Sequence, residues 1–251
     1  MTLALLSDIH ANLRALRACL AHARAQGATR FAFLGDLVGY GAEPAEVVDT
    51  AMAMAEGGTL ILQGNHDALA VRGGTGPTLA ESGAGWTHDQ LSASQRAFLA
   101  GLPLEITCGE ALLVHATADD PPAWHYATHP ARVQRSLDAA CARPGIRVVF
   151  GGHVHAQCLW YAGRTGHPMP FTPTPGAPIP LPRHRRWLAT LGSVGQPRDG
   201  DSRAGYALWD ESGPVPRVVF HRVPYDHLAA ADAVARTGLP GDFAKRLRQG
   251  R

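Results

Sequence analysis

The chain has 251 residues, 23 of them basic and 21 acidic, which gives a net charge of +2. So small a charge gives no argument for nucleic-acid or membrane binding by electrostatics alone. No apolar stretch reaches the roughly 18 residues that a transmembrane helix needs. A hydrophobic fraction of 45% is instead typical of a globular protein with a large core.

The N-terminus and the cysteines favour a cytoplasmic protein. The first residues run directly into Asp8 without the basic segment and cleavage site of a signal peptide. The four cysteines lack C-x-x-C spacing and are expected to be reduced thiols. We therefore expect no membrane partner and no specific nucleic-acid partner, whereas a homo-oligomer is compatible with the sequence.

The first hundred residues alternate between strands and helices. Short apolar runs predict strands over residues 3–6, 31–34 and 59–62. Helical spacing of apolar residues predicts one helix that ends at Gly27 and another that begins at Pro44 and ends at Gly57. This order implies parallel strands with right-handed crossovers. Residues 68–88 are Gly-rich and are expected to form a loop or a small cap.

The pattern changes after residue 150. Before it come a helix opened by the capping box Ser92-x-x-Gln95, a strand over 111–114, a helix that begins at Pro130 and a strand over 147–150. After it, strands are predicted over 158–161, 187–191, 206–209 and 217–223, followed by a helical C-terminus. A second, more antiparallel sheet packed on the first would explain this order. The sequence indicates one α/β domain over residues 1–251.

Residues 163–186 contain seven prolines and end in the basic run Arg183-His184-Arg185-Arg186. Proline cannot donate to a sheet ladder, so this segment is excluded from a central strand. We expect an extended, largely solvated loop inserted in the domain.

Five polar clusters follow apolar runs, where buried strands are expected to end. They supply carboxylate, amide and imidazole groups in numbers sufficient for two divalent transition-metal ions. Because parallel strands end at one edge of a sheet, the clusters are expected to converge there. If the chain stays extended, residues at i and i+2, such as Asp8 and His10, point the same way. The clusters are Asp8-Ile9-His10, Gly35-Asp36, Gly64-Asn65-His66-Asp67, Val114-His115 and Gly151-Gly152-His153-Val154-His155.

Most of these clusters have ordinary interpretations when taken singly. Gly35-Asp36 alone is typical of a turn, and a lone histidine such as His115 is more often a buried core residue than a ligand. The Gly-Asn-His-Asp and Gly-Gly-His-Val-His segments are more specific. Their joint occurrence, each at an expected strand end, makes coincidence improbable.

The ordered set of clusters resembles the calcineurin-like metallophosphoesterases, and is most similar to the small bacterial and archaeal YfcE-like phosphodiesterases. The resemblance covers residues 3 to about 210 and includes the late segment Gly192-Ser193-Val194-Gly195, which is followed by Arg198. It implies a four-layer α/β/β/α sandwich made of two mixed sheets flanked by helices. That agrees with the two sheets predicted from the strand order.

The resemblance also implies a role for each residue of the clusters. One metal would be held by Asp8, His10, Asp36 and His155, and the other by Asp36, Asn65, His115 and His153, with Asp36 bridging. His66 would assist departure of the alcohol, and Asp67 would orient His66 through a hydrogen bond. Manganese is the first expectation for the metal, with iron, nickel, cobalt and zinc also compatible.

Other residues are candidates for substrate contacts. Arg198 and Ser193 lie in the late segment, and Trp124 and Tyr126 follow His115 closely. An ordinary surface ion pair is an equally good interpretation of Arg198, and Trp124 and Tyr126 could simply cover the core.

The function implied is hydrolysis of small phosphate esters or nucleotides by metal-bound hydroxide, with a phosphodiesterase preferred. A phosphomonoesterase, a protein phosphatase and a dinucleoside-polyphosphate hydrolase need the same metal core and stay open. A non-catalytic metal-binding scaffold for protein interaction is an alternative of another class, but a scaffold has no physical need for His66.

Overall fold

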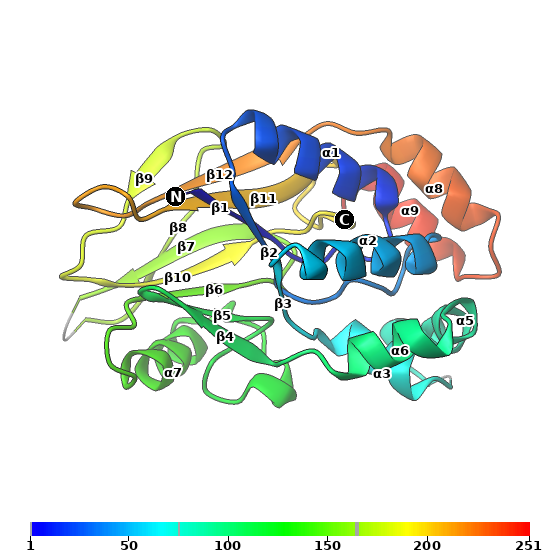
Figure 1. Ribbon diagram of the computed structural model, residues 1–251, viewed down its shortest axis with the longest axis horizontal. Coiled ribbons are helices and arrows are strands. Elements are labelled where there is room, and N and C mark those ends of the chain that lie inside the picture. The colour runs from blue at the N-terminus through cyan, green and yellow to red at the C-terminus, as the bar shows by residue number, and fades with distance from the viewer. Residues whose placement is uncertain (1, 75, 164–165) are drawn as a thin grey trace.

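The computed structural model describes residues 2–74, 76–163 and 166–251, and within them two mixed sheets pack face to face (Figure 1). The first sheet has the order β3 (Leu60–Ile61), β2 (Arg30–Phe33), β1 (Thr2–Leu6), β11 (Ala204–Asp210), β12 (Arg217–Val223) and β9 (Pro178–Pro180). The second has the order β4 (Glu105–Cys108), β5 (Ala111–Val114), β6 (Val148–Gly151), β10 (Arg186–Leu191), β7 (Gln157–Ala162) and β8 (Met169–Phe171).

Parallel pairing is confined to the strands that come before the site loops. β1 pairs in parallel with β2, and β2 with β3; in the second sheet β6 pairs in parallel with β5 and β10. The remaining neighbours are antiparallel. The carboxyl ends of β1, β2, β5, β6 and β10 therefore face the same edge of the sandwich.

Helices cover both outer faces, which completes the predicted four layers. They are α1 (Leu13–Ala25), α2 (Pro44–Glu56), α3 (Asn65–Arg72), α4 (Leu79–Ser82), α5 (Ala84–Gln90), α6 (Ala93–Ala100), α7 (Pro130–Cys141), α8 (His227–Ala235) and α9 (Gly241–Gln249), with a 3₁₀ turn at Pro121–Ala123. No helix within the described ranges combines the length and apolar character that a bilayer crossing requires.

Alternation along the strands separates the core into layers. In β1, Leu3 and Leu5 lie in the core between the two sheets, while Ala4 and Leu6 face the layer that contains α1 and α2. On the other side, α7 packs Leu137 and its neighbours against the outer face of the second sheet. The asparagine Asn12 begins α1 by accepting a hydrogen bond from the backbone N–H of Ala15.

The Gly-rich segment 68–88 is more regular than expected. Residue 75 lies outside the described part, but the rest contains all of α4 and most of α3 and α5. Thr78 and Glu81 form a capping box at the start of α4. Of the two predicted alternatives, a loop or a small cap, the structure therefore favours the second: these short helices form a helical cap.

Apart from Arg186, which begins the central strand β10, the Pro-rich segment 163–186 is kept out of the centre of either sheet, as predicted, but it is not simply a loop. Residues 164 and 165 lie outside the described part. The remainder adds one edge strand to each sheet, β8 beside β7 and β9 beside β12. Proline is tolerated in these strands because an edge strand pairs on one side only.

Candidate metal centre

The seven predicted ligands meet at the shared edge of the two sheets. Each follows the end of a strand or begins a helix: Asp8 and His10 after β1, Asp36 after β2, Asn65 at the start of α3, His115 after β5, and His153 and His155 after β6. All except the half-buried Asn65 are buried. The fold therefore assembles the polar groups that the sequence places at separate strand ends.

The backbone is strained where these side chains emerge. Five of the seven residues have positive φ, which is uncommon outside glycine: Asp8 (54°), His10 (48°), Asp36 (53°), His153 (64°) and His155 (63°). Such conformations cost about 1 kcal/mol or more each and cluster at functional sites. The chain does not stay extended between Asp8 and His10, so the condition for their shared direction is not met; left-handed turns aim both side chains at the site instead.

Two glycines allow the loops to approach one another. A Cβ on Gly64 would lie 2.2 Å from Oδ1 of Asp36, and a Cβ on Gly152 would lie 1.9 Å from Oγ of Ser7. Both distances are far below van der Waals contact. Glycine is therefore required at these positions by space, which explains its place in the clusters.

The first group of side chains contains Asp8, His10 and His155. Nε2 of His155 lies 3.1 Å from Oδ1 of Asp8 and 3.0 Å from Nε2 of His10. Nε2 of His10 lies 3.8 Å from Oδ2 of Asp36. One carboxylate and two imidazole nitrogens thus converge, with Asp36 beside them.

The second group contains Asp36, Asn65, His115 and His153. Nε2 of His115 lies 3.4 Å from Oδ2 of Asp36 and 3.1 Å from Oδ1 of Asn65. Ligand atoms of Asp36, His115 and His153 all lie within 4.8 Å of one another. Asp36 is therefore the carboxylate that both groups share.

Backbone carbonyls orient three of the imidazoles. Because a carbonyl only accepts, Nδ1 of each ring must carry the proton, and Nε2 of the neutral ring then has a free lone pair directed at the site. The Nδ1 atoms donate to the carbonyl oxygens as follows: His10 to Val38 (3.1 Å), His115 to Leu34 (2.7 Å) and His155 to Gln196 (2.7 Å).

These donors fit divalent metal ions. Oδ2 of Asp36 and Nε2 of His153 are buried and have no hydrogen-bond partner within the described structure. The two lone pairs of His10 and His155 face each other at 3.0 Å. Two unprotonated nitrogens cannot form a hydrogen bond with each other because neither has a proton to donate. A cation between such lone pairs satisfies them.

Burial and charge set the protonation of the site. Burial lowers the pKa of His10 well below its usual value and that of His153 to about 4, so both are neutral near pH 7, the form that binds metals. For His115 the burial effect is outweighed by the Asp36 carboxylate, and its pKa is raised to about 9. Neighbouring histidines overcome burial at Asp8 and Asp36 and hold both carboxyl pKa values low.

His66 lies beside the shared carboxylate. Its backbone N–H donates to Oδ1 of Asp36 (2.8 Å), and its ring centre is 5.0 Å from that of His10. Burial lowers the pKa of His66 to about 4, against the opposing effect of Asp36. Its ring nitrogen lies close enough to His10 and Asp36 to fit among metal ligands, so the geometry alone permits a ligand or a catalytic role.

Asp67 orients the loop rather than the His66 ring. Its carboxylate accepts from the backbone N–H of Gly64 (2.9 Å) and of Val38 (3.2 Å). Within the described residues no hydrogen bond joins Asp67 to His66. This revises the expected contact: Asp67 fixes the segment that carries both Asn65 and His66, and burial raises its pKa to about 7.

Tyr40 is a site residue that the sequence analysis missed. It has a φ of 63°, and its ring lies 4.3 Å from that of His66 and 4.7 Å from that of His10. The Arg198 guanidinium lies 5.4 Å from the Tyr40 ring centre. Arg198 therefore lies against Tyr40, whose ring adjoins His66, and its role in anion binding stays a prediction. The feature of the sequence that could have indicated Tyr40 is its position in Gly39-Tyr40-Gly41, four residues after Asp36.

Of the other residues proposed to contact substrate, two adjoin the second ligand group and one does not. Tyr126 stacks on His153 at 4.0 Å, and Trp124 lies edge-on to His115 at 5.6 Å, so both adjoin the second group. Ser193 is fully buried; its hydroxyl donates to the carbonyl of Asp8 and accepts from the N–H of Gln196. This contradicts the prediction that Ser193 contacts substrate, and makes it a support for the Asp8 loop.

A hollow of about 430 Å³ opens beside the second group. Its walls come from α3, the helical cap and the segment after β5, and include Asn65, His153, Trp124, Tyr126 and Arg72. Polar ligand groups at one end and aromatic rings along the wall suit a substrate with a phosphate and an organic substituent.

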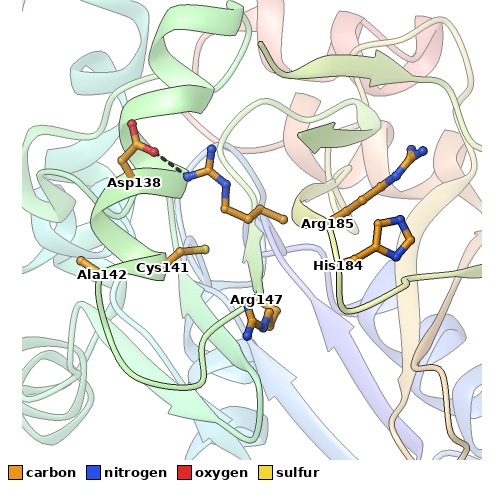
Figure 2. A pocket seen from close by; sticks show the side chains of 7 residues that line it. Asp138, Cys141, Ala142, Arg147, His184 and Arg185 are labelled. Atoms are coloured by element: carbon orange, nitrogen blue, oxygen red, sulfur yellow. Dashed lines mark hydrogen bonds and ion pairs between the residues drawn. The ribbon is translucent and has the colours of Figure 1, made fainter. Parts of the chain in front are cut away.

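A second hollow, of about 380 Å³, lies away from the site (Figure 2). Arg147 precedes β6 and Arg186 begins β10, so it lies at the opposite ends of the strands that carry His153 and Ser193. Arg186 is paired with Asp138 at 2.6 Å, and Figure 2 shows Arg185 directed away from Asp138. The cationic side chains that line this second hollow therefore do not converge on one point.

Comparison with known proteins gives the family. The model of the calcineurin-like phosphoesterase superfamily domain matches residues 1–213. An uncharacterized protein, MJ0912 of Methanocaldococcus jannaschii, is 30% identical over 264 residues, with 99% of this chain and 98% of that protein covered.

Solved structures agree with this match. A metallophosphoesterase from Sphaerobacter thermophilus is 31% identical with a TM-score of 0.82, and each chain is covered fully. The hypothetical protein PH1004 from Pyrococcus horikoshii OT3 is 19% identical with a TM-score of 0.76, over 100% of this chain and 98% of that one, and has the same fold. The chain belongs to the calcineurin-like phosphoesterase superfamily.

Proposed function

We propose that the protein is a metal-dependent phosphodiesterase with two divalent ions at the described edge of the sheets. The observation that carries the proposal is the convergence of two ligand groups on the Asp36 carboxylate, with His66 beside it. Asp8, His10 and His155 would complete one ion's coordination, and Asn65, His115 and His153 the other's. When bound, such ions neutralise charge on phosphoryl oxygens and lower the pKa of water, and manganese is the first candidate.

The chain's own residues then supply orientation and hydrogen bonding. Backbone carbonyls hold the rings of His10, His115 and His155 in the orientation that directs Nε2 at the site. His66 is neutral near pH 7 because burial lowers its pKa to about 4. A neutral imidazole keeps one N–H, which can stabilise the charge that develops on the leaving oxygen.

The hollow beside His153 supports a diester over a monoester. It extends from Asn65 past Trp124 and Tyr126, so a substituent on the phosphate other than the leaving group has a place to lie. A monoester would leave this aromatic wall without a contact. A scaffold without catalysis is disfavoured because it gives His66 no role.

The experiment is turnover by metal-free protein reconstituted with Mn, Fe, Co, Ni or Zn. Bis-p-nitrophenyl phosphate and p-nitrophenyl phosphate are the paired substrates. The proposal expects hydrolysis that needs metal, that is removed by chelation and that favours the diester. Turnover that survives chelation, or none with any ion, would count against a metal-dependent enzyme; preference for the monoester would count against the diesterase.

A further inference from the structure

A cation from the C-terminal helix reaches the neighbourhood of His66. The guanidinium carbon of Arg246, in α9, lies 5.9 Å from the centre of the Tyr40 ring, and that of Arg198 lies 5.4 Å from the same centre. The Tyr40 ring is 4.3 Å from the ring of His66. Two cations from distant parts of the chain therefore lie against Tyr40, the ring that packs beside His66.

Packing fixes the position of Arg246. Phe243, one turn earlier in α9, is fully buried and lies 4.8 Å from the Tyr40 ring; Ala244 and Leu247 are buried in the same cluster. The helix also packs against α8, as Figure 1 shows at the orange and red end of the chain. The apolar face of α9 thus directs Arg246 toward Tyr40, whereas the family match ends at residue 213.

Neither guanidinium is neutralised by a carboxylate. Among the described residues Arg198 and Arg246 form no ion pair, whereas Arg248, two residues along α9, pairs with Asp232 at 2.7 Å. Nε of Arg198 is buried and lacks a hydrogen-bond partner, and Nη2 of the same side chain donates to Oε1 of Gln196 (3.1 Å). Two such cations near one ring repel each other unless an anion joins them.

We propose that Arg246 and Arg198 bind a second phosphate on the leaving-group side of the substrate. This rests on the proposed function, because His66 marks the side from which the leaving oxygen departs. Guanidinium groups suit phosphate because their planar N–H pairs match its oxygens. The substrate class is then phosphodiesters or phosphoanhydrides whose leaving group carries a further phosphate, as in a nucleoside polyphosphate.

The competing explanation is that Arg246 only fastens α9 to Tyr40 through a cation–π contact. This explanation predicts a loss of stability without selectivity between ligands. An anion subsite predicts selectivity for ligands with two phosphoryl groups. The two are separated by a pair of stable ligand analogues, methylphosphonate and methylenediphosphonate.

The test is calorimetric binding of both analogues to the manganese-loaded protein and to variants. Arg246→Met keeps the apolar stem and removes the charge, Arg246→Lys restores a charge, and Arg248→Met removes a neighbouring paired cation. We expect Arg246→Met to weaken the binding of methylenediphosphonate about tenfold and the binding of methylphosphonate less than twofold. Arg246→Lys should recover part of the loss, and Arg248→Met should change neither.

Equal weakening of both analogues by Arg246→Met, or unchanged binding of methylenediphosphonate, would overturn the subsite. If Arg246→Met fails to fold, Arg198→Met serves as the second variant with the same expected selectivity. Binding needs no turnover, so the two proposals fail separately. A selective loss in a protein that hydrolyses nothing would leave the subsite standing and reject the hydrolase.

Discussion

The backbone N–H of His66 donates to Oδ1 of Asp36 at 2.8 Å, which leaves Oδ2 of Asp36 directed at both ligand groups. One carboxylate oxygen thus holds the loop of the proposed catalytic histidine, and the other serves the proposed metals. The contact uses the backbone of residue 66, so it persists when the side chain is changed. This allows catalysis and metal binding to be separated by mutation.

Replacing His66 with alanine should lower kcat roughly 10²- to 10⁴-fold, because a positioned hydrogen-bonding imidazole contributes on that scale. The metal content should stay that of the wild type, since the backbone bond to Asp36 remains. Steady-state kinetics and elemental analysis of the same preparation check this. A parallel loss of metal would instead make His66 a ligand.

Replacing Gly64 with alanine should damage the site through space alone. The new Cβ would lie 2.2 Å from Oδ1 of Asp36, so either the carboxylate or the loop must move. We expect kcat/KM to fall about 10- to 100-fold, the range found when ligand orientation is disturbed. Gly238→Ala is the matched control, because a Cβ there has no atom within 4 Å. Full activity in Gly64→Ala would contradict the close packing.

Tyr126→Ala should weaken substrate binding more than it weakens the fold. The ring stacks on His153 at 4.0 Å yet is 52% exposed, so its removal leaves little cavity. We expect KM for bis-p-nitrophenyl phosphate to rise roughly tenfold, as for an aromatic pocket wall. Phe171→Ala removes a similarly exposed ring (46%) on the distant edge strand β8 and should leave KM unchanged. Equal effects would argue against the hollow as the substrate pocket.

His221 should make folding sensitive to acid at a distance from the metal centre. Burial, and then the nearby His22, lower its pKa from 6.5 to about 4. Between pH 4 and 6.5 the unfolded chain therefore binds more protons at this residue than the folded chain does. The contribution of His221 to the free energy of unfolding is fully present above pH 6.5 and is lost as the pH falls toward 4. His221→Phe keeps a ring against Tyr206 but cannot titrate. Its free energy of unfolding should therefore fall less than that of the wild type as the pH is lowered from 6.5 to 4. Urea unfolding of metal-free protein measures it; equal losses would contradict the assignment.

Much of the fold, and the meeting of the candidate ligands at one edge of the sheets, could be predicted because both depend on local pattern. Buried parallel strands read as short apolar runs, and a polar cluster after each run marks the edge where strand ends meet. Asp8, Asp36 and His153 were therefore placed without a structure. The role of Ser193 was predicted wrongly because the sequence around a serine that follows a strand is the same whether its hydroxyl contacts substrate or bonds to a backbone carbonyl.

The remaining features depend on tertiary contacts. The left-handed turns at Asp8 and His10 are held by hydrogen bonds from their N–H groups to Gly35 and Asp36 of the neighbouring loop, which periodicity cannot show. The strands in the Pro-rich segment exist only because each sheet offers a free edge. Arg246 reaches Tyr40 across more than 200 residues of sequence, so only the packing of α9 shows it.

The most direct measurement is the number of manganese ions bound per chain, by equilibrium dialysis, in the wild type and in Asp36→Ala, together with hydrolysis of bis-p-nitrophenyl phosphate. The proposed site predicts two ions in the wild type and fewer in the variant. Turnover should fall at least about 10³-fold, since several kcal/mol of charge stabilisation depends on the shared carboxylate. Unchanged metal content and turnover in Asp36→Ala would contradict the two-metal centre.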